Sequence, residues 1–184
     1  MFALVLVMFA QPAGAAVDPR PDVLGVYFDE FGDRPCKDDL IQAVPFSVYF
    51  VYTNPTVNSI LGFEAGYYTT AGFLQLGIFP PCGIIWTVMP DLDNLYVTCA
   101  VPLATAQATP LFRIDYLYIG FEPLESVFYL EKARDSIQPG SNPYIILADG
   151  SPMEAQAADP AYTTTFCALA TEPMGWGTIK SLFR

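Results

Sequence analysis

Residues 111–121, LFRIDYLYIGF, and residues 46–53, FSVYFVYT, decide the fold class of this chain. In the first stretch, aromatic and aliphatic side chains alternate with Arg113 and Asp115. Because successive side chains of a β-strand point to opposite faces, the pattern predicts a strand whose apolar face consists of Phe112, Ile114, Tyr116 and Tyr118. The second stretch is rich in β-branched and aromatic residues and ends at Asn54-Pro55, which predicts another strand followed by a turn.

Short apolar runs separated by proline, glycine, asparagine and aspartate fill the rest of the chain. We expect further strands at Val23–Asp29, Leu61–Thr70, Leu74–Phe79, Ile84–Val88, Leu95–Val101, Ser126–Glu131, Tyr144–Ala148 and Thr163–Leu169. Helices are expected at most near 104–108 and at 176–183. About nine or ten short strands without long amphipathic helices predict an all-β protein, an antiparallel β-sandwich with a short C-terminal helix or strap.

The first fifteen residues have the pattern of a secretory signal peptide. An apolar run, Phe2–Ala10, precedes Ala13 and Ala15, which form the small-residue pair of a cleavage site. The usual Lys or Arg before the run is missing, which we attribute to a start assigned too late or to a fragment. A membrane anchor is the alternative, but the run has about half of the ~20 residues that a bilayer crossing needs. We therefore expect a secreted or cell-surface protein with a signal peptide at 1–15, one sandwich domain at 16–172 and a C-terminal segment at 173–184.

Charge and composition argue against several functions. The chain has 19 acidic and 8 basic residues, a net charge of −11, and such a surface repels nucleic acid. It has no histidine, which excludes Ser-His-Asp and Cys-His catalysis and most zinc hydrolase sites. No phosphate-binding glycine loop or dinucleotide fingerprint is present. We therefore expect neither catalytic activity nor an organic cofactor.

Four cysteines in an exported chain predict two disulfides. Three pairings are open. We favour Cys82–Cys99, which closes a local loop, with Cys36–Cys167 joining the two ends of the domain.

Two kinds of site could use the acidic residues. A pair of carboxylates could hydrolyse glycosides, and the candidates are Asp29, Glu30, Glu64, Asp91, Asp93 and Asp115. Calcium is the most plausible metal, because Asp91, Asp93 and Asn94 place three oxygen-bearing side chains within four residues. A second acidic cluster combines Asp29 and Glu30 with Asp33. For all of these residues the competing interpretation is a polar turn or a solvated strand face.

The best indication of binding comes from the aromatic residues, because 11 tyrosines and 14 phenylalanines exceed what a sandwich core usually needs. Tyr67 and Tyr68 are adjacent in a predicted strand, so at least one of them should point outward. An exposed row of such rings could stack on sugars or bind a protein partner, and we therefore name both tyrosines as candidate ligand-binding residues. Cross-strand aromatic packing is the alternative.

The C-terminal segment combines apolar and basic residues at helical spacing. Trp176, Ile179 and Phe183 form one stripe, and Lys180 and Arg184 place positive charge in the last turn. The segment is either a short helix or strap that packs on the sandwich, or a tag recognised by the export or surface-attachment machinery.

Several short motifs resemble a loose group of uncharacterised secreted proteins from uncultured bacteria. They are Gly25-Val26-Tyr27-Phe28-Asp29 with Cys36 after it, Thr53-Asn54-Pro55, Gly62-Phe63-Glu64, and the final Trp176–Arg184. More distantly, the strand order looks like that of cohesin-type and carbohydrate-binding sandwiches of the immunoglobulin kind. Neither resemblance implies a site residue.

Together these features predict an acidic, non-catalytic recognition module that binds a glycan or a protein at the cell surface. The alternatives are a structural envelope or filament subunit, expected to expose an unpaired edge strand, and a carboxylate-based glycoside hydrolase.

Overall fold

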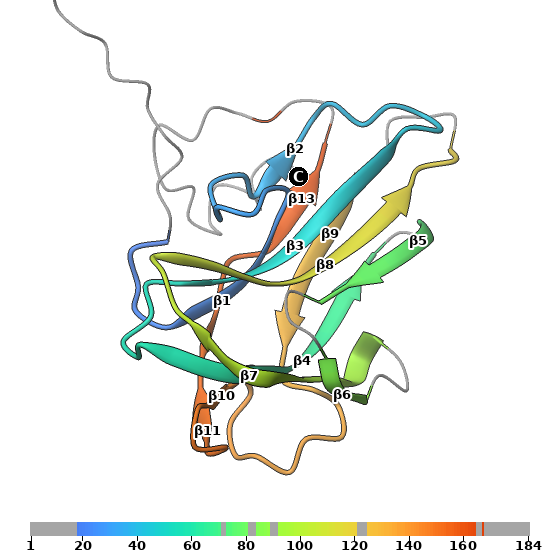
Figure 1. Cartoon of the computed structure of the whole chain (residues 1–184). Coiled ribbons are helices and arrows are strands. Elements are labelled where there is room, and N and C mark those ends of the chain that lie inside the picture. Colours follow the sequence, from blue (N-terminus) through green and yellow to red (C-terminus); the bar gives the residue numbers. More distant parts are fainter. Residues whose placement is uncertain are drawn as a thin grey trace, which may run out of the picture.

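Two β-sheets packed face to face form the structure, as the alternating sequence predicts (Figure 1). The computed structural model of the chain describes residues 18–70, 73–80, 84–88, 92–120, 125–164 and 167, and for 84–88 it describes the backbone alone. The predicted signal peptide and the segment 173–184, with Trp176, Ile179, Lys180, Phe183 and Arg184, lie outside the described residues.

The first sheet has five strands in the order β12-β1-β3-β8-β5. Their bounds are Gln156–Ala157 for β12, Val23–Tyr27 for β1, Pro45–Thr53 for β3, Ala108–Leu117 for β8 and Leu74–Phe79 for β5. All neighbours are antiparallel except β1 and β12. Residues 46–53 of β3 and the part of 111–121 that lies in β8 therefore pair with each other in the middle of this sheet.

The second sheet is built around the long strand β4, Ser59–Thr69. Six of its strands are hydrogen-bonded in the order β11-β10-β4-β9-β13-β2, and β7 pairs with both β4 and β6. The bounds are Pro152–Glu154 for β11, Tyr144–Leu147 for β10, Ser126–Glu131 for β9, Ala161–Thr163 for β13, Cys36–Lys37 for β2, Leu95–Ala104 for β7 and Ile84–Val88 for β6. A single 3₁₀ turn in the described residues, η1 at Leu92–Asn94, precedes β7.

Inward-facing side chains of both sheets form one core. The predicted apolar face is buried in it, namely Phe112, Ile114 and Tyr116 of β8 and Tyr118 directly after the strand. Phe50 of β3 contacts Phe63 and Tyr67 of the opposite sheet at ring-centroid distances of 6.1 and 5.0 Å. Because each large buried ring contributes about 2–3 kcal/mol by leaving water, this contact between the sheets is a major source of stability.

The predicted strands are mostly confirmed, and the differences have local causes. The described residues contain thirteen strands rather than nine or ten, because β2, β11 and β12 have only two or three residues each and carry no recognisable alternation. The expected helix at 104–108 is wrong. There β7 ends and β8 begins, joined by a turn in which the Thr109 hydroxyl accepts a hydrogen bond from the Ala106 amide at 2.8 Å. The last strand, β13, covers Ala161–Thr163, whereas the predicted strand runs from Thr163 to Leu169. Of the predicted range, 165–166 and 168–169 lie outside the described residues.

The Thr-Asn-Pro motif after β3 has a structural role. Asn54 adopts a left-handed conformation with φ of 48°. Its amide donates a hydrogen bond to the Gln107 carbonyl, and its carbonyl accepts one from the Asp22 amide. Asp22 accepts hydrogen bonds from the Thr56 amide at 2.8 Å and its hydroxyl at 2.7 Å, and from the Tyr52 hydroxyl. Burial opposes ionisation of Asp22, but these three donors together hold the pKa of its carboxyl below the usual value. The motif therefore fixes the start of β1 to the end of β3.

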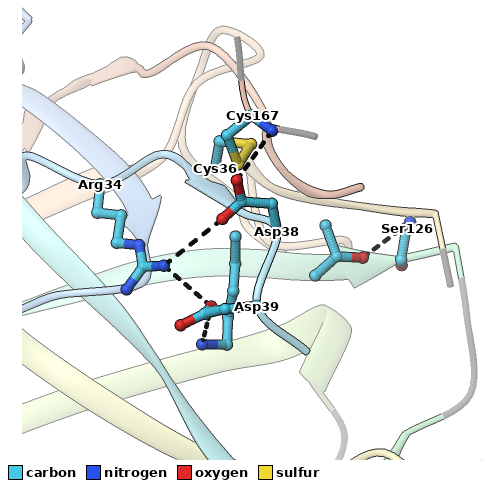
Figure 2. The surroundings of a disulfide bond; sticks show 8 residues. Arg34, Cys36, Asp38, Asp39, Ser126 and Cys167 are labelled. Carbon is cyan, nitrogen blue, oxygen red and sulfur yellow. Dashed lines mark hydrogen bonds and ion pairs between the residues drawn. A yellow bond between two sulfur atoms is a disulfide. The ribbon is translucent and has the colours of Figure 1, made fainter. Parts of the chain in front are cut away.

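The disulfide Cys36–Cys167 is confirmed, with Cα atoms 5.9 Å apart (Figure 2). It lies beside the parallel pair β2–β13, in which Tyr162 is opposite Cys36. The Cys167 amide donates to Asp38 at 3.2 Å, and Arg34 pairs with Asp39 at 2.9 Å. Cys99 is also disulfide-bonded. Its expected partner Cys82 lies outside the described residues, so Cys82–Cys99 stays a prediction.

Removing the Cys36–Cys167 bond should destabilise the domain strongly. The two cysteines are 131 residues apart, so the bond restricts the unfolded chain over most of its length. We expect the double variant Cys36→Ser, Cys167→Ser to lose roughly 3–5 kcal/mol of unfolding free energy in urea titrations. The control is Asp39→Ser, near the disulfide, which removes only exposed ion pairs. It should lose less than about 1 kcal/mol of unfolding free energy. Equal losses in the two variants would contradict this role.

Candidate functional site

The two tyrosines named from the sequence lie on opposite faces of β4. Tyr67 is 1% exposed and packs against Phe50 in the core. Its predicted role in contacting a ligand is therefore wrong, because the inward phase of the strand places it between the sheets. Tyr68 points to the outer face and is half-buried. The expectation that one ring of the pair is outward is confirmed.

Tyr68 forms part of an outward aromatic stripe across three strands. It stands opposite Tyr129 of β9, and the two rings stack with centroids 5.4 Å apart and planes 22° apart. On the same side of β9, Val127 is opposite Tyr162 of β13, and both are 37% exposed. We call these four residues, Tyr68, Tyr129, Val127 and Tyr162, the tyrosine face.

Gly66 allows two loops to meet at one end of the tyrosine face. A Cβ atom at this position would lie 3.0 Å from the backbone oxygens of Asp93 and Lys132 and 3.0 Å from the Tyr68 ring. A side chain would therefore require the turn η1, the segment after β9 and the ring to shift by a few tenths of an ångström. The absence of a side chain lets all three converge beside Tyr68.

Charges of both signs border the aromatic pair at this point. Asp93 forms an ion pair with Arg134 at 3.2 Å, and the Arg134 amide donates to the Asp93 carbonyl at 3.0 Å. Glu131 is exposed opposite Gly66. Burial, and then the nearby carboxylates Asp93 and Glu131, raise the pKa of Tyr68, so its hydroxyl stays protonated and able to donate.

The same region contains the described part of the candidate calcium site. The Asn94 side-chain oxygen accepts a hydrogen bond from the Asp135 amide at 2.8 Å, and Asp93 is paired with Arg134. Asp91 lies outside the described residues. Within the residues that the structure describes, no three carboxylates or cysteines are grouped as metal ligands. Calcium binding at Asp91, Asp93 and Asn94 stays a prediction, and the ion would compete with Arg134 for the Asp93 carboxylate.

A surface hollow of about 350 Å³ adjoins Tyr129. Its lining includes Glu131 of β9, Ser141 and Asn142 of the following loop, and Pro160 before β13. The hollow therefore offers, beside Tyr129, polar groups that can donate and accept hydrogen bonds, together with the apolar residues Leu130, Ala157 and Ala158.

Among the carboxylates proposed for glycoside hydrolysis, Asp29, Asp93 and Asp115 are held by hydrogen bonds or ion pairs within the fold. Asp29 accepts hydrogen bonds from the amides of Phe31 and Asp33, which closes the turn after β1 and also accounts for the second acidic cluster. Asp115 pairs with Arg113 at 3.1 Å on the outer side of the first sheet. Glu64 is 9% exposed on β4, in register with Tyr96 and Tyr144. Asp29, Asp115 and Glu64 belong to different parts of the fold, and Glu30 is an exposed turn residue.

Sequence reasoning missed Tyr129, Tyr162 and Arg134. Tyr129 stands in a strand that was correctly predicted, and its alternation with Phe128 and Leu130 marks it as outward. What the sequence lacks is the register that brings it opposite Tyr68.

No protein-family model matches the chain, and no curated protein matches it. Among solved structures, a cohesin module from a family 33 glycoside hydrolase of Clostridium perfringens superposes with a TM-score of 0.52 at 9% identity, covering 78% of this chain and 98% of that module. The third ScaB cohesin of R. flavefaciens, solved in complex with a group 1 dockerin, gives a TM-score of 0.49 at 10% identity, covering 82% and 99%. At such identities the first similarity supports the fold alone, a cohesin-like β-sandwich.

Adding one methyl group at Gly66 should lower the stability of the protein by crowding the loops beside Tyr68. Because the new Cβ atom would crowd two backbone oxygens, we expect Gly66→Ala to lose roughly 1–3 kcal/mol of unfolding free energy in urea titrations. Val101→Ala, at a position 67% exposed on β7, is the control, and should stay within about 0.5 kcal/mol of the parent. A Gly66→Ala variant as stable as the parent would contradict tight packing of these loops around Gly66.

Proposed function

We propose that this chain is a non-catalytic recognition module that binds a protein partner through the tyrosine face. The observation that carries the proposal is the outward stacked pair of Tyr68 and Tyr129, bordered by Asp93, Arg134 and Glu131. Tyrosine and arginine are enriched at the centres of protein interfaces, since they combine a large apolar area with hydrogen bonding.

The geometry of the pair favours a protein over a glycan. A sugar ring stacks on the open face of an aromatic ring, but Tyr68 and Tyr129 each cover one face of the other. The stacking therefore takes up ring surface on which a sugar would otherwise stack. Adjacent charges of both signs suit complementary side chains of a protein surface.

The proposed place of action is outside the cytoplasm, in the medium or at the cell surface. The Cys36–Cys167 bond supports it, because structural disulfides persist in oxidising compartments. The described part of the chain contains no helix with the length and apolar character that crossing a membrane requires. In this proposal residues 16–172 form the module, and Trp176, Ile179, Lys180, Phe183 and Arg184 belong to a separate segment that packs on it or attaches it.

The test is a depletion assay with the protein produced in an oxidising compartment. The protein is mixed with immobilised extracellular proteins of the source cells, with envelope fragments and with insoluble polysaccharides. We expect saturable loss from solution onto a protein fraction. The double variant Tyr68→Ala, Tyr129→Ala should bind at least tenfold more weakly, because it removes the aromatic centre of the surface.

The matched control is Tyr49→Ala, a half-buried tyrosine of β3 opposite Arg113 in the first sheet. It should bind like the parent, and all variants should keep the parent circular dichroism spectrum. Equal weakening by Tyr49→Ala, or undiminished binding by the double variant, would contradict the proposed site. Tyrosine-dependent depletion onto a polysaccharide alone would replace the protein partner by a glycan.

A further inference from the structure

Strand β5 forms one edge of the first sheet, with β8 as its neighbour (Figure 1). Among the described residues no strand pairs with its other side. An edge of this kind presents a row of backbone donors and acceptors, which a further strand can bind.

The side chains of β5 make this edge apolar. No charged residue occurs between Phe73 and Pro80 in a chain of net charge −11. Leu74 and Leu76 are each 50% exposed, and Phe79 is 45% exposed. Native proteins usually protect such edges with charges, and here the protection is limited to one bulge between Gln75 and Gly77 and to the proline that follows the strand.

The neighbouring strand adds no net charge to this edge. Arg113 of β8 pairs with Asp115 at 3.1 Å, and Asp115 also accepts a hydrogen bond from Ser47 at 2.7 Å. The Arg113 guanidinium lies 4.3 Å from the centre of the Phe79 ring. Two acidic molecules that approach each other along β5 would therefore meet at a locally neutral surface.

The bulge shifts the alternation of inward and outward residues along β5 by one position. Leu74 is opposite Leu117 and Phe79 is opposite Arg113, so both point outward like their partners in β8. Gln75 and Ile78 are opposite the inward residues Tyr116 and Ile114. In an antiparallel pair of two β5 strands centred between Leu76 and Gly77, Leu74 meets Phe79 of the second copy. Gln75 then meets Ile78, so each of these pairs joins residues of the same face.

We propose that β5 is a self-association edge, through which two copies of this chain pair antiparallel and join their five-stranded sheets. A two-fold pairing of one edge is closed, so it gives a dimer and not a filament. It lies on the sheet opposite to the tyrosine face and does not depend on the proposed function.

The test measures oligomeric state by sedimentation velocity from micromolar to millimolar concentration. We expect a monomer–dimer equilibrium. Leu76→Lys should raise the dissociation constant at least tenfold, because it places a buried charge at the centre of the pairing. Val101→Lys, which adds the same charge at an exposed site on β7, should leave the equilibrium unchanged. Added salt should strengthen the dimer, since it screens the repulsion between two acidic chains.

A second measurement uses the unmodified protein, so that it does not depend on how the variants fold. Amide hydrogen exchange should slow with protein concentration in residues 74–79 and not in the tyrosine face. A monomer at every concentration would overturn the proposal. So would a dimer that survives Leu76→Lys, or one whose concentration-dependent protection lies outside β5.

Discussion

The structure depends on the contact of Phe50 with both sheets. Its ring belongs to β3 and lies within 5.0–6.1 Å of Phe63, Tyr67 and Phe112, so one side chain joins the centre of the first sheet to the central strand of the second. Because side chains alternate along a strand, fixing these residues inward also fixes their neighbours outward. A slip of one residue in β4 would place Tyr67 in solvent and Tyr68 in the core, and the tyrosine face would be lost.

The outer surfaces follow from that constraint and differ between the two sheets. On β4 the outward residue beside the Tyr68 ring is Gly66, which leaves room for the loops carrying Asp93 and Arg134. On the first sheet, the outward residues of β8 include the ion pair Arg113 and Asp115, next to an uncharged edge. The Cys36–Cys167 bond joins the ends of the domain beside β13, which carries Tyr162 of the tyrosine face. One sandwich therefore offers a face suited to a protein partner and an edge suited to a second copy.

Much of the fold could be predicted from the sequence, because strands such as β3 and β8 carry their alternation in consecutive residues. The outward direction of Tyr68 could also be predicted from its neighbour Tyr67. The partners of Tyr68 could not. Tyr129 and Arg134 reach the site through strand register and loop contacts between distant segments, and bulges shift that register in ways that local patterns do not record. Strands of two or three residues, such as β2, are defined by their pairing and leave no periodic signal.

A partner that binds as proposed covers the tyrosine face. Hydroxyl-radical footprinting of the protein, alone and bound to the protein fraction that depletes it, measures this coverage at individual residues. We expect Tyr68, Tyr129 and Tyr162 to be modified in the free protein and protected in the complex, while the buried Tyr67 stays unmodified in both. Protection confined to other surfaces, with Tyr68, Tyr129 and Tyr162 modified equally in both states, would contradict the proposed binding surface.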